Sequence, residues 1–175
     1  IILEDYNKGL LTPRVIKTVI EMANNSGVII TVDPKRDNFF EYKDVTLFKP
    51  NLKELKEGLN VEFDFEMGKE KFEEAIDLLE AKLNNKMTFV TLSEHGVFIK
   101  CSDEKSYIPA HVRKIADVSG AGDTVISIAT LCLTIGMSPE MVAAIANLSG
   151  GLVCEYSGVV PIDKELLLRE VKKIV

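Results

Sequence analysis

The segment Asp117-Val-Ser-Gly-Ala-Gly-Asp123 carries four small residues between two acids, and the apolar run TVISIATLCLTIGM follows it directly. A helix that starts in such a loop presents unpaired N–H groups and a positive dipole end, and glycines let an anion approach them closely. A tight turn with Asp123 as N-cap would also explain the glycines, but not Ala121 or the small Ser119. The segment has no P-loop lysine, and Val125 replaces the third glycine of the dinucleotide fingerprint. We therefore expect a phosphate loop of another kind.

A second candidate is the segment Asn51-Leu52-Lys53-Glu54. Asparagine at an N-cap with glutamate three residues later predicts a capping box at the start of a helix. The amide and the carboxylate would also suit a hard cation such as Mg²⁺, which prefers oxygen ligands and usually keeps several waters. Both interpretations can hold together, because a cap fixes the geometry of the two side chains.

Charged residues follow the first two expected strands, in the segments DYNKG and VDPK. Asp5 could contact a sugar phosphate, and Lys8 or Lys35 could help to neutralise a phosphate group. Solvated surface charge is the plain alternative for these residues and for Asp33. The residue types alone leave both interpretations open.

Strands and helices must alternate to position these segments. Apolar and β-branched runs predict strands over IILE, VIITVD, VTLFKP and MTFVTL, and a hairpin over GVFIKCSDEKSYIPA. Helical periodicity and caps predict helices after Thr12-Pro13, from residue 51, over KEKFEEAIDLLEAKL, and over residues 124–135, 139–153 and 163–174, with Ser138 and Asp163 as N-caps of the last two. The predicted fold class is α/β: a doubly wound, mostly parallel sheet with helices on both faces.

In such a sheet, ligands bind beyond the carboxyl ends of the strands, where the chain leaves for the next helix. The loops expected there are DYNKG, DPKRDN, KPNLKE, SEHG and DVSGAGD. They carry most of the unusual polar and glycine residues of the chain. The sequence therefore predicts one small-molecule site at this edge.

The segment DVSGAGD resembles the D-T/V-T-G-A-G-D signature of the ribokinase-like sugar kinases, the PfkB family of carbohydrate kinases, with Ser119 for the usual threonine. With GAGDTVIS, DYNKG, VDPK and LFKPNLKE at matching intervals, the chain is most similar to the D-glycero-D-manno-heptose 7-phosphate kinase branch, which includes the kinase half of the bifunctional heptose kinase and adenylyltransferase. The resemblance spans essentially the whole chain. It implies a Rossmann-like fold, the use of ATP and Mg²⁺, and phosphorylation of the heptose 7-phosphate to the 1,7-bisphosphate for ADP-heptose and lipopolysaccharide precursor synthesis. A fructokinase, a ribokinase and a non-catalytic nucleotide-binding module remain alternatives.

The resemblance also implies roles for single residues. Asp123 would be the catalytic base, and the backbone N–H groups of Gly120, Ala121 and Gly122 would form the anion hole. Asp117 would brace the loop, in a neighbourhood where some relatives hold a monovalent cation; whether this protein does is left open. The residues implied on the nucleotide side are Asn51, Glu54 (through magnesium-bound water), Ser93, Glu94, Gly96 and Asn147. A capping box, a plain β-turn and a surface asparagine are the alternatives for these positions.

The composition of the chain limits the kinds of partner that it can bind. The 175 residues are 46% hydrophobic and 7% aromatic, which suits one domain with an aliphatic core. A net charge of -6 argues against nucleic acid or an anionic membrane, so a sugar phosphate and ATP are the expected partners. Three widely spaced cysteines suggest a reducing cytoplasm. The longest apolar run, the 14 residues from Thr124 to Met137, is shorter than the roughly 20 residues that cross a bilayer.

In the family, most sugar contacts and the lid strands that often form the dimer come from the amino-terminal half. This chain opens on Ile1-Ile2-Leu3, which resembles the inside of a buried strand. We therefore expect residues 1–175 to be the C-terminal, nucleotide-binding portion of a kinase domain, lacking the N-terminal part and lid. Alone, the chain is expected to have little or no kinase activity, and the full-length protein to be a homodimer.

Overall fold

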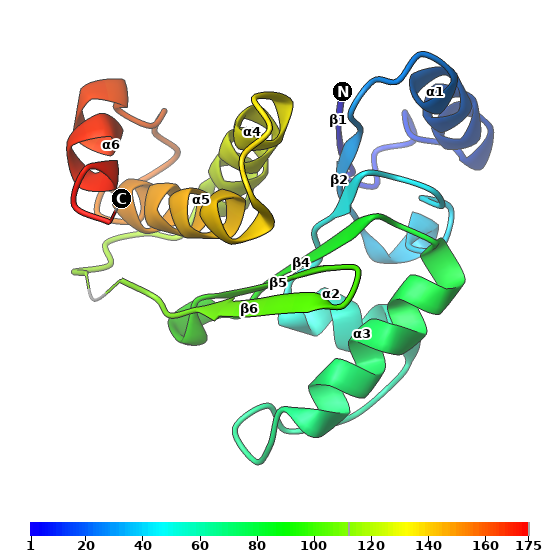
Figure 1. Ribbon diagram of the computed structural model, residues 1–175, viewed down its shortest axis with the longest axis horizontal. Helices are drawn as coiled ribbons and strands as arrows, with labels where there is room; N and C mark the ends of the chain where they lie inside the picture. Colours follow the sequence, from blue (N-terminus) through cyan, green and yellow to red (C-terminus); the bar gives the residue numbers. More distant parts are fainter. Residues whose placement is uncertain (112, 175) are drawn as a thin grey trace.

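The computed structural model describes residues 1–111 and 113–174. Their strands form one six-stranded sheet in the order β1-β2-β3-β4-β5-β6 (Figure 1). Strands β1 to β4 are parallel to one another, and β5 and β6 extend the sheet as an antiparallel hairpin. The strands are β1 (Ile2–Glu4), β2 (Thr31–Asp33), β3 (Leu47–Phe48), β4 (Met87–Thr91), β5 (Val97–Cys101) and β6 (Glu104–Ile108).

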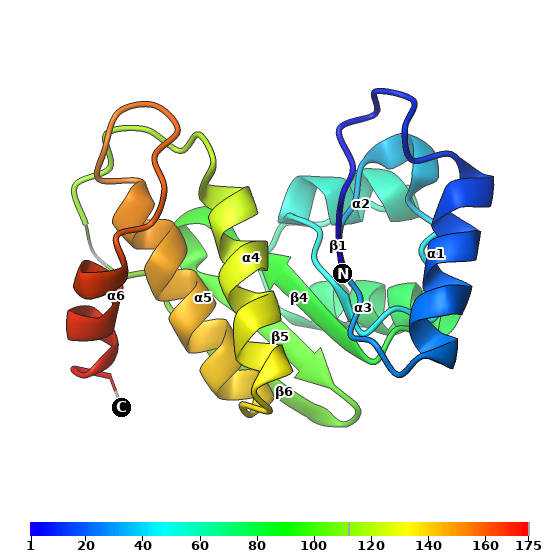
Figure 2. The ribbon, with the colours of Figure 1, turned by 90° about the horizontal axis from the view of Figure 1, so that it is seen from above.

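Helices cover both faces of the sheet, which confirms the predicted fold class (Figures 1 and 2). One face packs on α1 (Pro13–Asn25), α2 (Leu52–Leu59) and α3 (Glu70–Leu83). The other packs on α4 (Ala121–Thr134) and α5 (Pro139–Val153), and α6 (Lys164–Val171) packs outside α5. Two short 3-10 turns, η1 (Arg36–Asn38) and η2 (Ser93–His95), complete the elements.

Neighbouring strand residues supply two separate hydrophobic cores because side chains alternate across a sheet. Phe48 and Val90 lie in the core under α1 to α3, whereas Leu47 and Phe89 lie in the core under α4 and α5. All four side chains are buried. Burial on both faces explains why these strands have no polar alternation.

Helix starts follow the local capping signals. Thr12 caps α1 with Pro13 in the first turn, and Ser138 and Asp163 cap α5 and α6, each accepting a backbone N–H three residues later. The capping box of Asn51 and Glu54 is fully formed at α2. These side chains satisfy N–H groups that have no partner within the helix.

The start of α4 differs from the prediction. The helix begins at Ala121 rather than Thr124, and its N-cap is Gly120, which has a left-handed backbone conformation (φ 77°) and no side chain to cap with. Asp123 therefore lies inside the first turn, so the alternative that made it the N-cap is wrong. Helix α6 ends at Val171, three residues before the expected end.

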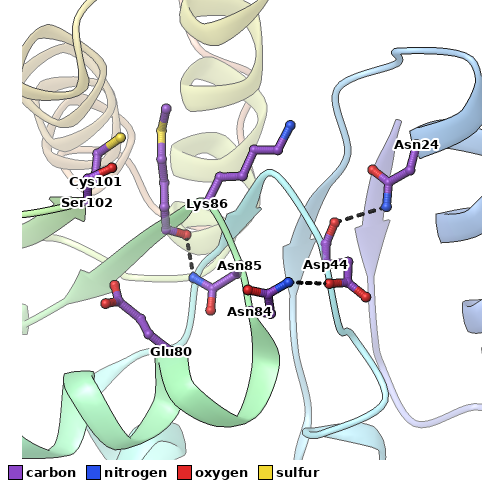
Figure 3. A pocket seen from close by; sticks show the side chains of 9 residues that line it. Asn24, Asp44, Glu80, Asn84, Asn85, Lys86, Cys101 and Ser102 are labelled. Atoms are coloured by element: carbon purple, nitrogen blue, oxygen red, sulfur yellow. Dashed lines mark hydrogen bonds between the residues drawn. The ribbon is translucent and has the colours of Figure 1, made fainter.

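A polar hollow of about 680 Å³ lies at the amino ends of β3 and β4, away from the predicted site (Figure 3). Its polar groups mainly bind one another: the Asn84 amide donates to the Asp44 carboxylate at 2.6 Å, and Asn24 donates to the Asp44 carbonyl. None of the residues predicted for the site lines it. Among the residues that the structure describes, no helix has the length and apolar character needed to span a membrane.

Candidate active site

The carboxyl ends of β2 and β3 bring acids and lysines together beside the start of α4. Asp33 ends β2 and forms a 2.9 Å ion pair with Lys49, which follows β3 and is almost fully buried. Lys35 pairs with Glu54 at the start of α2. Burial acts to lower the pKa of Lys35, but the carboxylates of Glu54, Asp33 and Asp123 outweigh burial and raise the pKa overall. The site thus holds two lysines among several carboxylates.

The glycine loop lies directly over this charged pair. A Cβ atom added at Gly122 would be 3.5 Å from Asp33 Oδ2 and 3.8 Å from Lys49 Nζ, so the backbone of Gly122 closely approaches both groups. The N–H of Ala121 donates to the Val118 carbonyl at 3.3 Å. For the N–H of Gly122 no protein acceptor is found among the described residues. A free N–H at a helix start with a buried lysine beside it suits an anion.

Asp117 holds the loop in shape. Its Oδ1 accepts the backbone N–H and the hydroxyl of Ser119, and its Oδ2 accepts the N–H of Gly158. These bonds, with the Ser119 N–H first, lower the pKa of Asp117 to about 2. The carboxylate therefore stays ionised down to acidic pH and ties the loop to the segment after α5.

Glu54 suits a contact with Mg²⁺ through water better than direct coordination. Its Oε1 accepts from Lys35, and its Oε2 accepts the N–H of Asn51 at 2.9 Å. Each oxygen keeps a further lone pair that can accept a bond from a metal-bound water. No cluster of three or more His, Cys, Asp or Glu side chains placed to hold a metal is found among the described residues. The residues present fit a hydrated magnesium ion carried in with the phosphates.

Asp5 and Lys8 lie in the loop after β1 in different surroundings. Asp5 is buried and accepts bonds from the Asn38 amide, the Tyr42 hydroxyl and the Asn7 N–H. Burial alone would raise the pKa of Asp5, but these donors lower it overall. Asp5 thus already has a bracing role inside the protein, whereas Lys8 is exposed. Their contacts with a sugar phosphate stay predictions.

The residues predicted for the nucleotide side fall into two groups. Asn51 and the exposed Ser93 line one hollow of about 900 Å³ beside α2. Gly96 and Asn147 both lie against the segment after β6: the Asn147 amide donates to the Pro109 carbonyl at 2.9 Å, and the backbone of Gly96 closely approaches Ile108 to Ala110. Ser93 has a positive φ (55°), a backbone conformation that glycine adopts most easily. Glu94 is exposed next to it.

Gly96 is expected to be hard to replace, because its backbone packs closely against the segment after β6. A Cβ at Gly96 would lie 2.0 Å from the carbonyl oxygen of Ile108, and its φ is 86°. Gly96→Ala should therefore lower the free energy of unfolding by roughly 3 kcal/mol, measured by urea denaturation. Gly9→Ala is the matched control, since Gly9 has φ 85° but open space around it, and should cost only about 1 kcal/mol. Equal losses in the two variants would contradict the clash.

Three residues of this site were not predicted from the sequence: Glu4, Tyr6 and Lys49. Glu4 ends β1, and burial raises its pKa, with Asp123 and Asp33 adding to the effect and Lys49 opposing it. The Tyr6 hydroxyl donates to Asp123 Oδ2 at 2.8 Å. For Lys49 the sequence held one local signal, because this lysine directly follows the apolar run VTLF. A lysine next to a buried strand indicates a charged partner, since lysine is seldom buried without one.

Known proteins resemble this chain over most of its length. Residues 8–165 match the pfkB family of carbohydrate kinases, which is most of the chain. The chain belongs to the PfkB family. A curated PfkB relative, "Bifunctional protein HldE" of Campylobacter fetus subsp. fetus (strain 82-40), is 35% identical over 153 residues, which cover 87% of this chain and 32% of the relative. Other curated relatives of the same name are 31% to 39% identical, and this chain spans about a third of their length.

Solved structures share the fold of this PfkB chain. Phosphofructokinase-2 from Escherichia coli in complex with potassium matches with a TM-score of 0.83 at 19% identity, over 94% of this chain and 53% of the other. Arabidopsis thaliana ribokinase complexed with ribose and ATP matches with a TM-score of 0.80 at 18% identity, over 98% of this chain and 55% of the other. These likenesses confirm a ribokinase-like fold.

Proposed function

We propose that the protein transfers the γ-phosphoryl group of ATP to a hydroxyl of a phosphorylated sugar, namely D-glycero-D-manno-heptose 7-phosphate. One observation carries the proposal: Asp123 lies in the first turn of a buried helix, one residue after Gly122, whose backbone closely approaches the buried Lys49. This pairs a proton acceptor with a place for a phosphoryl group. The curated relatives are bifunctional proteins by name, which agrees with the branch that the motifs resemble.

In the proposed reaction, Asp123 accepts the proton of the sugar hydroxyl while the oxygen of that hydroxyl forms a bond to the γ-phosphorus. The bond between the γ-phosphorus and the bridging oxygen breaks, and ADP leaves with the electron pair. Phosphoryl transfer depends mainly on positioning and on stabilising charge, so the protein needs little covalent chemistry of its own. Bound Mg²⁺ would neutralise phosphate charge, and Glu54 would orient its water ligands.

The loop residues supply the charge stabilisation. The N–H groups of Gly120, Ala121 and Gly122 would face the transferring group, with that of Ala121 first released from Val118. Lys49 lies close to the backbone of Gly122, and charges in a region of low dielectric interact more strongly than in water, although the ion pair with Asp33 offsets part of the lysine charge. Lys35 and Lys8 would contact phosphate oxygens. The nucleotide would lie against a set of residues on the other side of the site: Asn51, Ser93, Glu94, Gly96 and Asn147.

The test is a substrate screen of the protein together with the coding sequence that precedes Ile1. Mg-ATP is supplied with heptose 7-phosphate, fructose or ribose, and ADP release is measured. We expect turnover with heptose 7-phosphate well above that with the other two sugars. Preference for fructose or ribose would move the protein to another branch of the family, and no turnover with any sugar would favour a nucleotide-binding module. The same preparation would test the expected homodimer and whether turnover depends on a monovalent cation. The cytoplasm stays the expected location.

A further inference from the structure

The hydroxyl of Tyr6 reaches Asp123 across 117 positions of sequence. It donates to Oδ2 at 2.8 Å and so links the loop after β1 to the first turn of α4. The other carboxylate oxygen, Oδ1, accepts no hydrogen bond from the residues that the structure describes. One oxygen of Asp123 is therefore held, and the other is left for a ligand.

The two sequence neighbours of Tyr6 fix the direction of its side chain, although about half of the surface of Tyr6 is exposed. On one side, Asp5 is buried and bound by Asn38 and Tyr42. On the other, the Asn7 amide donates to Asp37 at 2.6 Å, and its N–H closes a turn onto Asp5. Asn7 has a left-handed backbone (φ 57°), which turns the chain sharply at this point. The segment Asp5-Tyr6-Asn7 is thus fixed at both ends and directs its middle side chain toward α4.

The electrostatic surroundings keep Tyr6 a hydrogen-bond donor. Its bond to Asp123, then burial and the charges of Asp123, Glu4 and Asp33, raise the pKa of Tyr6 to about 12. The phenol therefore remains protonated at any physiological pH. A neutral donor can orient a carboxylate without cancelling the charge that makes it a base, which a lysine in the same place would do.

We propose that Tyr6 is a positioning residue for Asp123: it holds Oδ2 so that Oδ1 points at the acceptor hydroxyl of the sugar. This proposal rests on the proposed kinase function. The arrangement follows a general pattern in which a third group orients the base of a catalytic pair. The proposal also explains why Asp5 is buried at the edge of the site, because the hydrogen bonds that Asp5 accepts hold the segment that carries Tyr6.

Kinetics of the full-length protein test the role. Tyr6→Phe should lower kcat by about 10-fold to 100-fold, the effect of losing one hydrogen bond to a charged group, with the KM for ATP changed less than about 2-fold. Tyr107→Phe is the matched control, because Tyr107 also donates to a carboxylate, Glu73 at 3.0 Å, but between β6 and α3. Its kcat should equal that of the parent. A Tyr6→Phe enzyme with the kcat of the parent would overturn the proposal.

A second measurement examines the contact without any turnover. In protein with ring-labelled tyrosine, the NMR signal of Tyr6, identified by its loss in Tyr6→Phe, should titrate near the raised pKa of about 12. Asp123→Asn should move that midpoint down toward the ordinary value of 10.0. An unchanged midpoint would overturn the positioning role. A parent protein that is inactive on every sugar but keeps the shifted midpoint would instead overturn the proposed function.

Discussion

Replacing Asp123 with asparagine is expected to lower kcat by about 100-fold to 10,000-fold, the range that a positioned general base contributes. Asparagine has the same shape and keeps an oxygen that can accept the Tyr6 hydroxyl, so the geometry should persist while the proton acceptor is lost. The KM for ATP should change little, because Asp123 would act on the sugar hydroxyl. Steady-state ADP release with heptose 7-phosphate is the measurement.

The control for this variant is Asp103→Asn, an equal change of charge in the exposed turn between β5 and β6. It should leave kcat unchanged. Thermal unfolding of both variants should match that of the parent within a few degrees, which separates loss of chemistry from loss of fold. An Asp123→Asn enzyme that keeps more than about a tenth of the parent kcat would contradict the assignment of Asp123 as base.

Local signals in the sequence predicted much of the fold. The ends of α5 agree with expectation because Ser138, Pro139 and the apolar period are all properties of neighbouring residues. The capping box at Asn51 and Glu54 is a further local signal, and the structure contains it in full. The alternation of strands and helices then restricted the topology to a doubly wound sheet.

Contacts between distant segments could not be predicted in the same way. The start of α4 was placed too late because Gly120 caps it through its backbone conformation and not through a side chain. The bond from Tyr6 to Asp123 and the pair of Asp33 with Lys49 join residues that belong to different elements. Their partners depend on the order of strands in the sheet, which periodicity does not specify. The bonds that Asp5 accepts from Asn38 and Tyr42 could not be predicted for the same reason, since these donors lie more than 30 positions away.

Lys49→Met is expected to give the largest loss of stability in the site, about 3 to 5 kcal/mol at neutral pH by urea denaturation. Lys49 is 3% exposed and its ion pair with Asp33 is 2.9 Å long. Methionine fills a similar volume but leaves the buried Asp33 carboxylate without its ion-pair partner. A buried charge that loses its partner keeps the whole cost of desolvation, which is larger than the net gain from the intact pair.

The pH dependence identifies the cause of that loss. Burial raises the pKa of Asp33 and Lys49 opposes the rise, so the pKa should rise further in Lys49→Met. A carboxyl group with a raised pKa in the folded state favours folding at low pH and loses that contribution as pH rises through the folded-state pKa. The deficit should therefore be smaller at about pH 5 than at about pH 8.

The double variant Asp33→Leu with Lys49→Met should recover most of the stability, because neither charge of the pair remains buried. A double variant no more stable than Lys49→Met would mean that the loss comes from packing and not from the uncompensated carboxylate.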